Sequence, residues 1–95
     1  MIIKTDPKKI IQRENDQIFI YTYQGDIESA ILICNTSPNE YKEKFTIKSK
    51  NLQLPEENPF VTAIKSGEDS LIRMQKVNAN LEGNFEIEFG SAFVY

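Results

Sequence analysis

The stretch Phe85-Glu86-Ile87-Glu88-Phe89 decides the fold of this chain, because its side chains alternate strictly between large apolar groups and carboxylates. Successive side chains of a β-strand point to opposite faces of a sheet. The three apolar groups therefore share one face and the two carboxylates share the other, which is typical of a strand between a core and solvent. We expect a strand here whose apolar face lies in the core.

Short runs of a similar kind fill most of the chain and are separated by residues that favour turns. Residues 17–23 (QIFIYTY) are rich in β-branched and aromatic side chains, which suit a pleated sheet, and residues 28–35 form an apolar run. Further strands are expected at residues 8–13, 41–49, 60–65, 70–78 and 91–95. An irregular loop is expected at residues 52–59, because Pro55 and Pro59 lack the backbone donor that a central strand needs. No segment has the periodicity of a helix.

The chain is predicted to form one all-β domain that spans residues 1–95. About seven or eight strands joined by short connections favour antiparallel pairing, because parallel strands need long crossovers. The strand count and spacing are typical of an immunoglobulin-like sandwich of two antiparallel sheets. A small β-barrel is the alternative. The expected core consists of Ile18, Ile20, Ile31, Ile33, Phe45, Ile47, Val61, Ile72, Met74, Phe85, Ile87 and Phe89.

The charge of the chain argues against nucleic acid as a partner. The net charge is −3, and lysines are interleaved with carboxylates, as in Lys42-Glu43-Lys44. Proteins that bind nucleic acid usually carry a basic stripe that displaces counterions from phosphate. We interpret the mixed charges as a solvated face.

Most catalytic chemistry is missing from the residue inventory. The chain has no histidine and one cysteine, Cys34, so neither a histidine-activated nucleophile nor a zinc site with four Cys or His ligands can be built. Cys34 lies in an apolar run, where a thiol usually packs as a small hydrophobic group. The four glycines are isolated at turns and form no phosphate-binding loop. The sequence therefore predicts a protein that is not an enzyme and that carries no cofactor.

Carboxylates are the remaining candidates for chemistry. They lie in three predicted turns, as Asp26 with Glu28, Glu56 with Glu57, and Glu68 with Asp69. If the three turns met at one end of the sandwich, their oxygens would suit a hard cation such as calcium. The alternative is that these groups are solvated turn charges. A glycosidase-type acid and base pair would need a cleft, for which a sandwich of this size has little room.

An aromatic row is the most distinctive surface feature that the sequence predicts. If Ile18 and Ile20 face the core, then Phe19, Tyr21 and Tyr23 share the opposite face of the same strand. Aromatic side chains concentrate at the centres of protein interfaces. The row is therefore a candidate contact surface for a partner, and packing of the rings against a neighbouring loop or the terminal segment at residues 93–95 is the alternative.

The sequence also bears on compartment. A single cysteine leaves no intramolecular disulfide, which fits a reducing compartment. The opening residues 1–7 turn polar after Ile3, unlike a signal peptide, and no apolar run approaches the length of a transmembrane helix. We expect a cytoplasmic protein without a transmembrane segment.

Two stretches resemble the small β-sandwich domains associated with calpain-like proteins of protists. One is residues 17–23 (QIFIYTY) with the strand that follows at residues 30–34, and the other is residues 64–72 (IKSGEDSLI). The second stretch resembles a Pro-Gly-Glu-Thr turn before a strand, with Ser66 in place of the proline and Asp69 in place of the threonine. The resemblance covers residues 17–77. It implies a non-catalytic accessory domain at the cytoskeleton or the membrane periphery.

Together these features favour a non-enzymatic module that binds a protein partner through the aromatic face or by adding a strand at a sheet edge. The charged strand at residues 41–48 is expected to be an edge protected by its charges. Residues 8–13 and 91–95 are the expected unprotected edges, through which the chain would form a homo-oligomer. A calcium- or lipid-responsive module of C2-like type is the alternative function, and an enzyme that uses carboxylates alone is the third.

Overall fold

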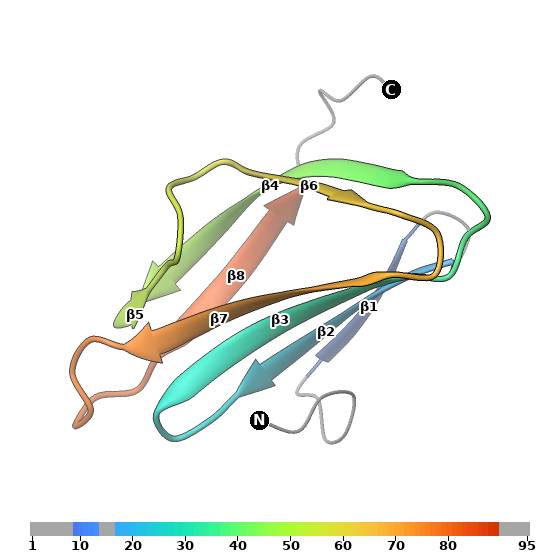
Figure 1. Ribbon diagram of the computed structural model, residues 1–95. Helices are drawn as coiled ribbons and strands as arrows, with labels where there is room; N and C mark the ends of the chain where they lie inside the picture. Colours follow the sequence, from blue (N-terminus) through green and yellow to red (C-terminus); the bar gives the residue numbers. More distant parts are fainter. Residues whose placement is uncertain (1–8, 14–16, 90–95) are drawn as a thin grey trace.

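The computed structural model of the chain describes residues 9–13 and 17–89 (Figure 1). All regular structure in these residues is β, as the sequence predicts. The strands are β1 (Lys9–Arg13), β2 (Ile18–Gln24), β3 (Glu28–Asn35), β4 (Tyr41–Lys50), β5 (Leu52–Gln53), β6 (Phe60–Ile64), β7 (Asp69–Lys76) and β8 (Asn84–Phe89). The strand expected at residues 91–95 lies outside the described residues.

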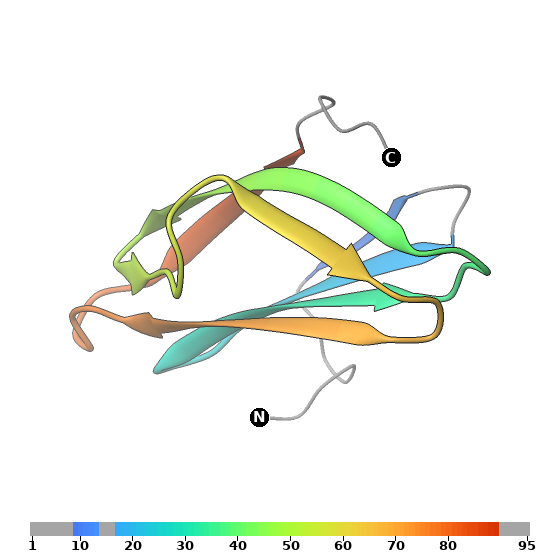
Figure 2. The same cartoon turned by 45° about the horizontal axis from the view of Figure 1, so that its top comes forward.

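The described strands form two antiparallel sheets packed as a sandwich (Figure 2). The five-stranded sheet has the order β1-β2-β3-β7-β5, and the three-stranded sheet has the order β6-β4-β8. The chain crosses between the sheets after β3, and β7 returns to pair with β3 while β8 returns to pair with β4. These pairings match those of strands B with E and C with F in an immunoglobulin-like sandwich.

The core lies between the sheets, and both sheets contribute side chains to it. Ile18, Ile20, Ile31, Ile33 and Met74 come from the five-stranded sheet, and Phe45, Ile47, Phe60 and Ile64 come from the three-stranded sheet. The Phe45 ring stacks on Phe60 with centroids 5.5 Å apart and meets Phe89 at 6.0 Å. The alternation at residues 85–89 is confirmed, because Phe85, Ile87 and Phe89 pack against this core while Glu86 and Glu88 are exposed.

One predicted core residue is wrong. Val61 is 61% exposed, and its neighbours Phe60 and Ile64 are buried instead. The run from residue 60 to 64 is apolar on both sides except for Thr62, so its pattern did not fix which face is inward. Pairing with β4 fixes it, because Phe60 lies opposite the buried Phe45.

The predicted edge role of the charged strand is also wrong. β4 lies at the centre of its sheet, between β6 and β8. Its outward lysines include Lys48, which lies opposite Glu86 and forms an ion pair with Glu88 of β8. This pair joins two strands inside the sheet, and the charges of β4 do not protect an edge. The expectation that residues 8–13 form an edge strand is confirmed by β1, which pairs with β2 alone among the described strands.

Two asparagines fix the connections between the sheets. Asn35 is 1% exposed, and its side chain donates to the backbone oxygens of Asn39 and Ile64 at 2.8 Å and accepts from Ser37. It thereby joins the end of β3 to the end of β6. Asn51 has a left-handed backbone (φ 61°), and its side chain donates to the oxygens of Asn78 and Leu81. Asparagine tolerates this conformation better than most residues.

Within the described residues, no helix is long and apolar enough to cross a membrane.

Candidate interaction surface

The outer face of the five-stranded sheet carries a second apolar cluster. On this face the registers of β2, β3 and β7 align three rows, each running across the three strands. The rows are Phe19-Cys34-Asp69, Tyr21-Leu32-Leu71 and Tyr23-Ala30-Arg73. We call these nine residues the outer-face grid. The grid confirms the prediction that the three aromatic residues of β2 lie opposite Ile18 and Ile20.

Burial within the grid differs between its strands, because the three β3 residues are buried and the three β7 residues are exposed. Leu32 is 3% exposed, and Ala30, Cys34 and Tyr23 are also buried, although all lie on the side of the sheet that faces away from the core. Phe19 and Tyr21 are half-buried and stack with their centroids 6.4 Å apart. Leu71 is 39% exposed. The aromatic rings of β2 thus pack with the apolar side chains of β3, while the β7 side remains accessible. Packing against the segment at residues 93–95 is not tested, because that segment lies outside the described residues.

Strand β3 is consequently apolar on both faces. Ile31 and Ile33 face the main core, whereas Leu32 and Cys34 face the grid. Antiparallel sheets commonly keep one face solvated, so an apolar outer face on this sheet is unusual. The continuous apolar run from residue 30 to 34 encodes this arrangement, and contacts on both faces give β3 its burial.

The rim of the grid is charged. Arg73 is exposed on β7 opposite Ala30, and no ion pair of Arg73 occurs among the described residues. Asp69 lies at the far end of the same strand, opposite Cys34. An apolar centre with a charged rim is the usual layout of a protein interface.

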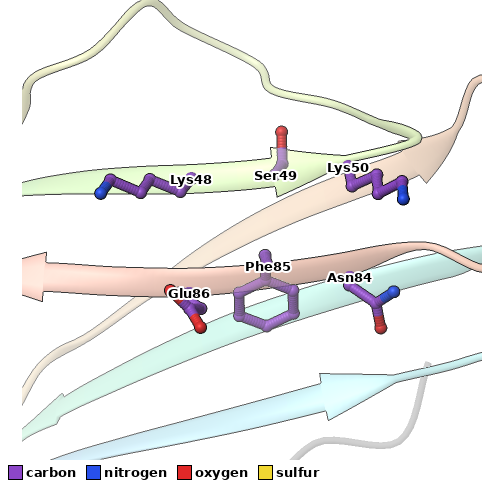
Figure 3. Close-up of a pocket in the computed structure, with 6 residues that line it drawn as sticks. All are labelled: Lys48, Ser49, Lys50, Asn84, Phe85 and Glu86. Atoms are coloured by element: carbon purple, nitrogen blue, oxygen red, sulfur yellow. The ribbon is translucent and has the colours of Figure 1, made fainter.

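The outer face of the three-stranded sheet has the opposite character. Lys48 Nζ lies 2.6 Å from Glu88 Oε1, and both groups are exposed. The hydrogen bond and the charge of Glu88 raise the pKa of Lys48, and the charge of Glu86 adds to this. Figure 3 shows the end of this strand pair, where residues of β4 and β8 line a surface depression formed by Lys48, Ser49, Lys50, Asn84, Phe85 and Glu86. Three of its six lining residues, Lys48, Lys50 and Glu86, are charged.

The three acidic turns do not converge. Glu28 lies at the start of β3 opposite Gln75, whereas Asp69 lies opposite Cys34, six residue steps further along β3 and about 20 Å away. Asp26 adjoins Glu28, Glu68 adjoins Asp69, and Glu56 and Glu57 lie in the loop between β5 and β6. Among the described residues no group of three metal-ligating side chains is close enough to hold an ion. The condition for the calcium hypothesis is therefore not met in this part of the chain.

Sequence reasoning missed several residues of the surface and one buried carboxylate. Leu32, Leu71 and Arg73 join the grid through strand pairing that no local pattern reveals, although the double-sided apolar run of β3 gave a signal for Leu32. Glu43 points into the core face of β4 and is buried, and it accepts a hydrogen bond from Tyr41 Oη at 2.9 Å. The alternation expected over residues 41–49 would have predicted the inward position of Glu43, because residue 43 shares a face with Phe45.

Comparison with known proteins gives no further guide, since no protein-family model, curated protein or solved structure matches the chain.

Proposed function

We propose that this chain is a non-enzymatic interaction module whose contact surface is the outer-face grid. The single observation that carries the proposal is that Leu71 and the half-buried rings of Phe19 and Tyr21 leave apolar surface accessible on the outer face of a sheet whose inner face already forms the core. Apolar surface of this kind, rimmed by polar groups, marks interaction sites in soluble proteins.

The proposed partner is a protein segment with an apolar stripe and a carboxylate beside it. The apolar stripe would cover Leu71 and the half-buried rings of Phe19 and Tyr21. The carboxylate would meet Arg73, whose planar guanidinium suits two parallel hydrogen bonds to a carboxylate. The resemblance to calpain-associated domains adds the prediction that this module serves as an accessory domain in the cytoplasm, at the cytoskeleton or the membrane periphery.

The residue chemistry supports a binding role rather than catalysis. The pKa of the exposed Lys48 is raised by its hydrogen bond and ion pair with Glu88, and such a pair needs no catalytic role to explain it. Catalytic groups usually combine a perturbed pKa with a recessed site. Cys34 is buried among the apolar side chains of the grid, which suits packing more than nucleophilic attack.

A photo-reactive amino acid at position 71 tests the proposal, with the same group at position 46 on the outer face of β4 as the control. After irradiation in extract of the native cells, the adduct is identified and the captured protein is purified. Position 71 should give a discrete protein adduct and position 46 should not. Equal adducts at both positions would defeat the proposal.

Titration of the purified partner then tests individual groups of the grid. Tyr21→Ser should weaken binding by about thirtyfold or more, as loss of a central aromatic contact typically does, whereas Tyr21→Phe keeps the ring and should stay near the wild-type affinity. Arg73→Glu should weaken binding, and a reversed charge on the partner should restore it. Vesicles of phosphatidylserine and phosphatidylcholine test whether the grid binds lipid. If the wild type binds these vesicles, Tyr21→Ser abolishes that binding and position 71 gives no protein adduct, then the grid is a lipid-binding surface.

A further inference from the structure

The edge strand β6 carries no charge, in contrast to the edge strands β1 and β8. The described sheets end at β1, β5, β6 and β8. β1 contains Lys9 and Arg13, β8 contains Glu86 and Glu88, and β5 is only two residues long. Natural proteins protect edge strands with charges, prolines or short length, because an open edge pairs with other strands. β6, with the sequence Phe-Val-Thr-Ala-Ile, lacks the charges.

The hydrogen bonds of Asn58 show which backbone groups of β6 remain available. Asn58 Nδ2 donates to the oxygen of Ile47 at 2.8 Å, and the Ile47 nitrogen donates to Asn58 Oδ1 at 2.8 Å. Residues 58 and 47 continue the register of Phe60 with Phe45. The backbone N–H and C=O of Ile47 therefore point toward the β6 side of β4.

Backbone polarity alternates along an antiparallel strand. Phe45, Glu43 and Tyr41 consequently point toward β6 as Ile47 does, and they exchange hydrogen bonds with Phe60, Thr62 and Ile64. The two residues between these partners, Val61 and Ala63, direct their N–H and C=O groups away from β4. Both also have exposed side chains, so the edge offers two donors and two acceptors beside two uncharged residues.

We propose that β6 pairs with β6 of a second copy of this chain, antiparallel and about a two-fold axis at Thr62. In this register Val61 lies opposite Ala63 of the second copy, and Ala63 lies opposite Val61 of the second copy. Each of these two pairs exchanges two N–H···O=C hydrogen bonds, which gives four in total. The register is the one that overlaps all five residues while keeping inward side chains opposite inward ones. The contact is isologous, so it closes as a dimer and does not extend into a fibre.

Charge permits this contact. Lys44 lies opposite Val61, and Lys42 lies opposite Ala63. Across the dimer, Lys44 of one copy and Lys42 of the other would be three strand spacings apart, about 14 Å. This exceeds the Debye length of about 8 Å at physiological ionic strength, so repulsion between these lysines is screened. A five-residue edge contact is smaller than a standard interface, and the dimer should therefore be weak and dependent on concentration.

Sedimentation velocity of the whole chain, from micromolar to millimolar concentration, tests the self-association. The wild type should shift from monomer to dimer. Ala63→Pro removes a donor that β4 does not use, so the fold should persist, and dimerisation should weaken by about tenfold or more because two of the four bonds are lost. Val61→Lys, an exposed change that needs no backbone adjustment, should also give a monomer.

Disulfide trapping tests the register in a Cys34→Ala background. Thr62→Cys should form a covalent dimer on mild oxidation, because directly opposite residues without mutual hydrogen bonds lie about 4.5 Å apart at Cα, within the range of about 4.4–6.8 Å for bridged cysteines. Ala63→Cys should cross-link more slowly, since it lies opposite Val61.

Three results would overturn the proposal. One is a wild-type chain that stays monomeric at every concentration. The proposal is overturned in the same way if the chain stays monomeric and β6 binds an added extended peptide instead. The others are a dimer that Ala63→Pro and Val61→Lys leave unchanged, and faster trapping at position 63 than at position 62. Leu71→Lys, on the opposite sheet, should leave the dimer intact, which separates this proposal from that for the outer-face grid.

Discussion

The outer faces of the two sheets differ although their inner faces contribute to the same core. On β4 and β8 the outward residues are polar or charged, and Lys48 forms an ion pair across the strands with Glu88. On β2 and β3 the outward residues form an apolar cluster, and Leu71 of β7 is exposed on the same face. The outer face of the three-stranded sheet is thus polar and solvated. The outer face of the five-stranded sheet has accessible apolar side chains, which is the basis of the proposed contact surface.

The largest expected effect comes from placing the same charge at the centre of each outer face. Leu32→Lys introduces an ammonium at a position only 3% exposed and should lower the free energy of unfolding by about 3 kcal/mol or more. Thr46→Lys, opposite Glu88, should stay within about 0.5 kcal/mol of wild type. Urea unfolding of both variants measures the difference. Equal tolerance at the two positions would show that the outer faces are equivalent.

Removal of the connection between the two sheets should have the next largest effect. Asn35→Ala deletes the amide that joins the end of β3 to Ile64 of β6 and leaves buried backbone groups without partners. We expect a loss of about 2–3 kcal/mol in thermal or urea unfolding. Asn51→Ala, which removes bonds at an exposed turn, is the comparison and should cost less. The reverse order would mean that Asn35 does not hold the sheets together.

Cys34 offers an internal reporter of the outer face. Phe19 lies directly opposite Cys34, so Phe19→Ala should expose the thiol and accelerate its reaction with a thiol reagent. Phe45→Ala, in the main core, provides a control under conditions where both variants remain folded, and it should not expose Cys34 selectively. An unchanged rate in Phe19→Ala would indicate that the aromatic row does not cover β3.

The sequence predicts the residues of one outer face better than those of the other. The alternation at residues 85–89 gave both the inward aromatics and the outward carboxylates of β8, because its period is unambiguous. The aromatic row of β2 was also predictable from Ile18 and Ile20. The remainder of the grid was not, since Leu71 and Arg73 join it only through the register of β7 with β3.

Three further features escaped prediction for local physical reasons. The run at residues 60–64 is apolar on both sides, so its inward face was assigned to Val61 in error. The charges of β4 were interpreted as edge protection because their partners on β8 lie about forty residues away in sequence, and cross-strand pairs are set by register. β5 has two residues, too few to show any period.

The smallest expected effect concerns the charged face. Lys48 has a raised pKa in the folded chain, so its ion pair contributes stability at pH values below the ordinary lysine pKa of about 10.4 and loses it as pH rises through the folded value. Because both groups are exposed, Glu88→Gln should change the midpoint of thermal unfolding only slightly, and added salt should remove the difference. A large effect that survives high salt would contradict this description of the charged face.

The most direct test of the outer-face grid as a contact surface compares the affinity of the purified partner for two matched variants, Leu71→Lys and Thr46→Lys. Both add one lysine to the outer face of a sheet, at a position that is not fully buried. We predict binding weaker by about thirtyfold or more for Leu71→Lys and an affinity near wild type for Thr46→Lys. Equal affinities for the two variants, with both folded, would contradict the account.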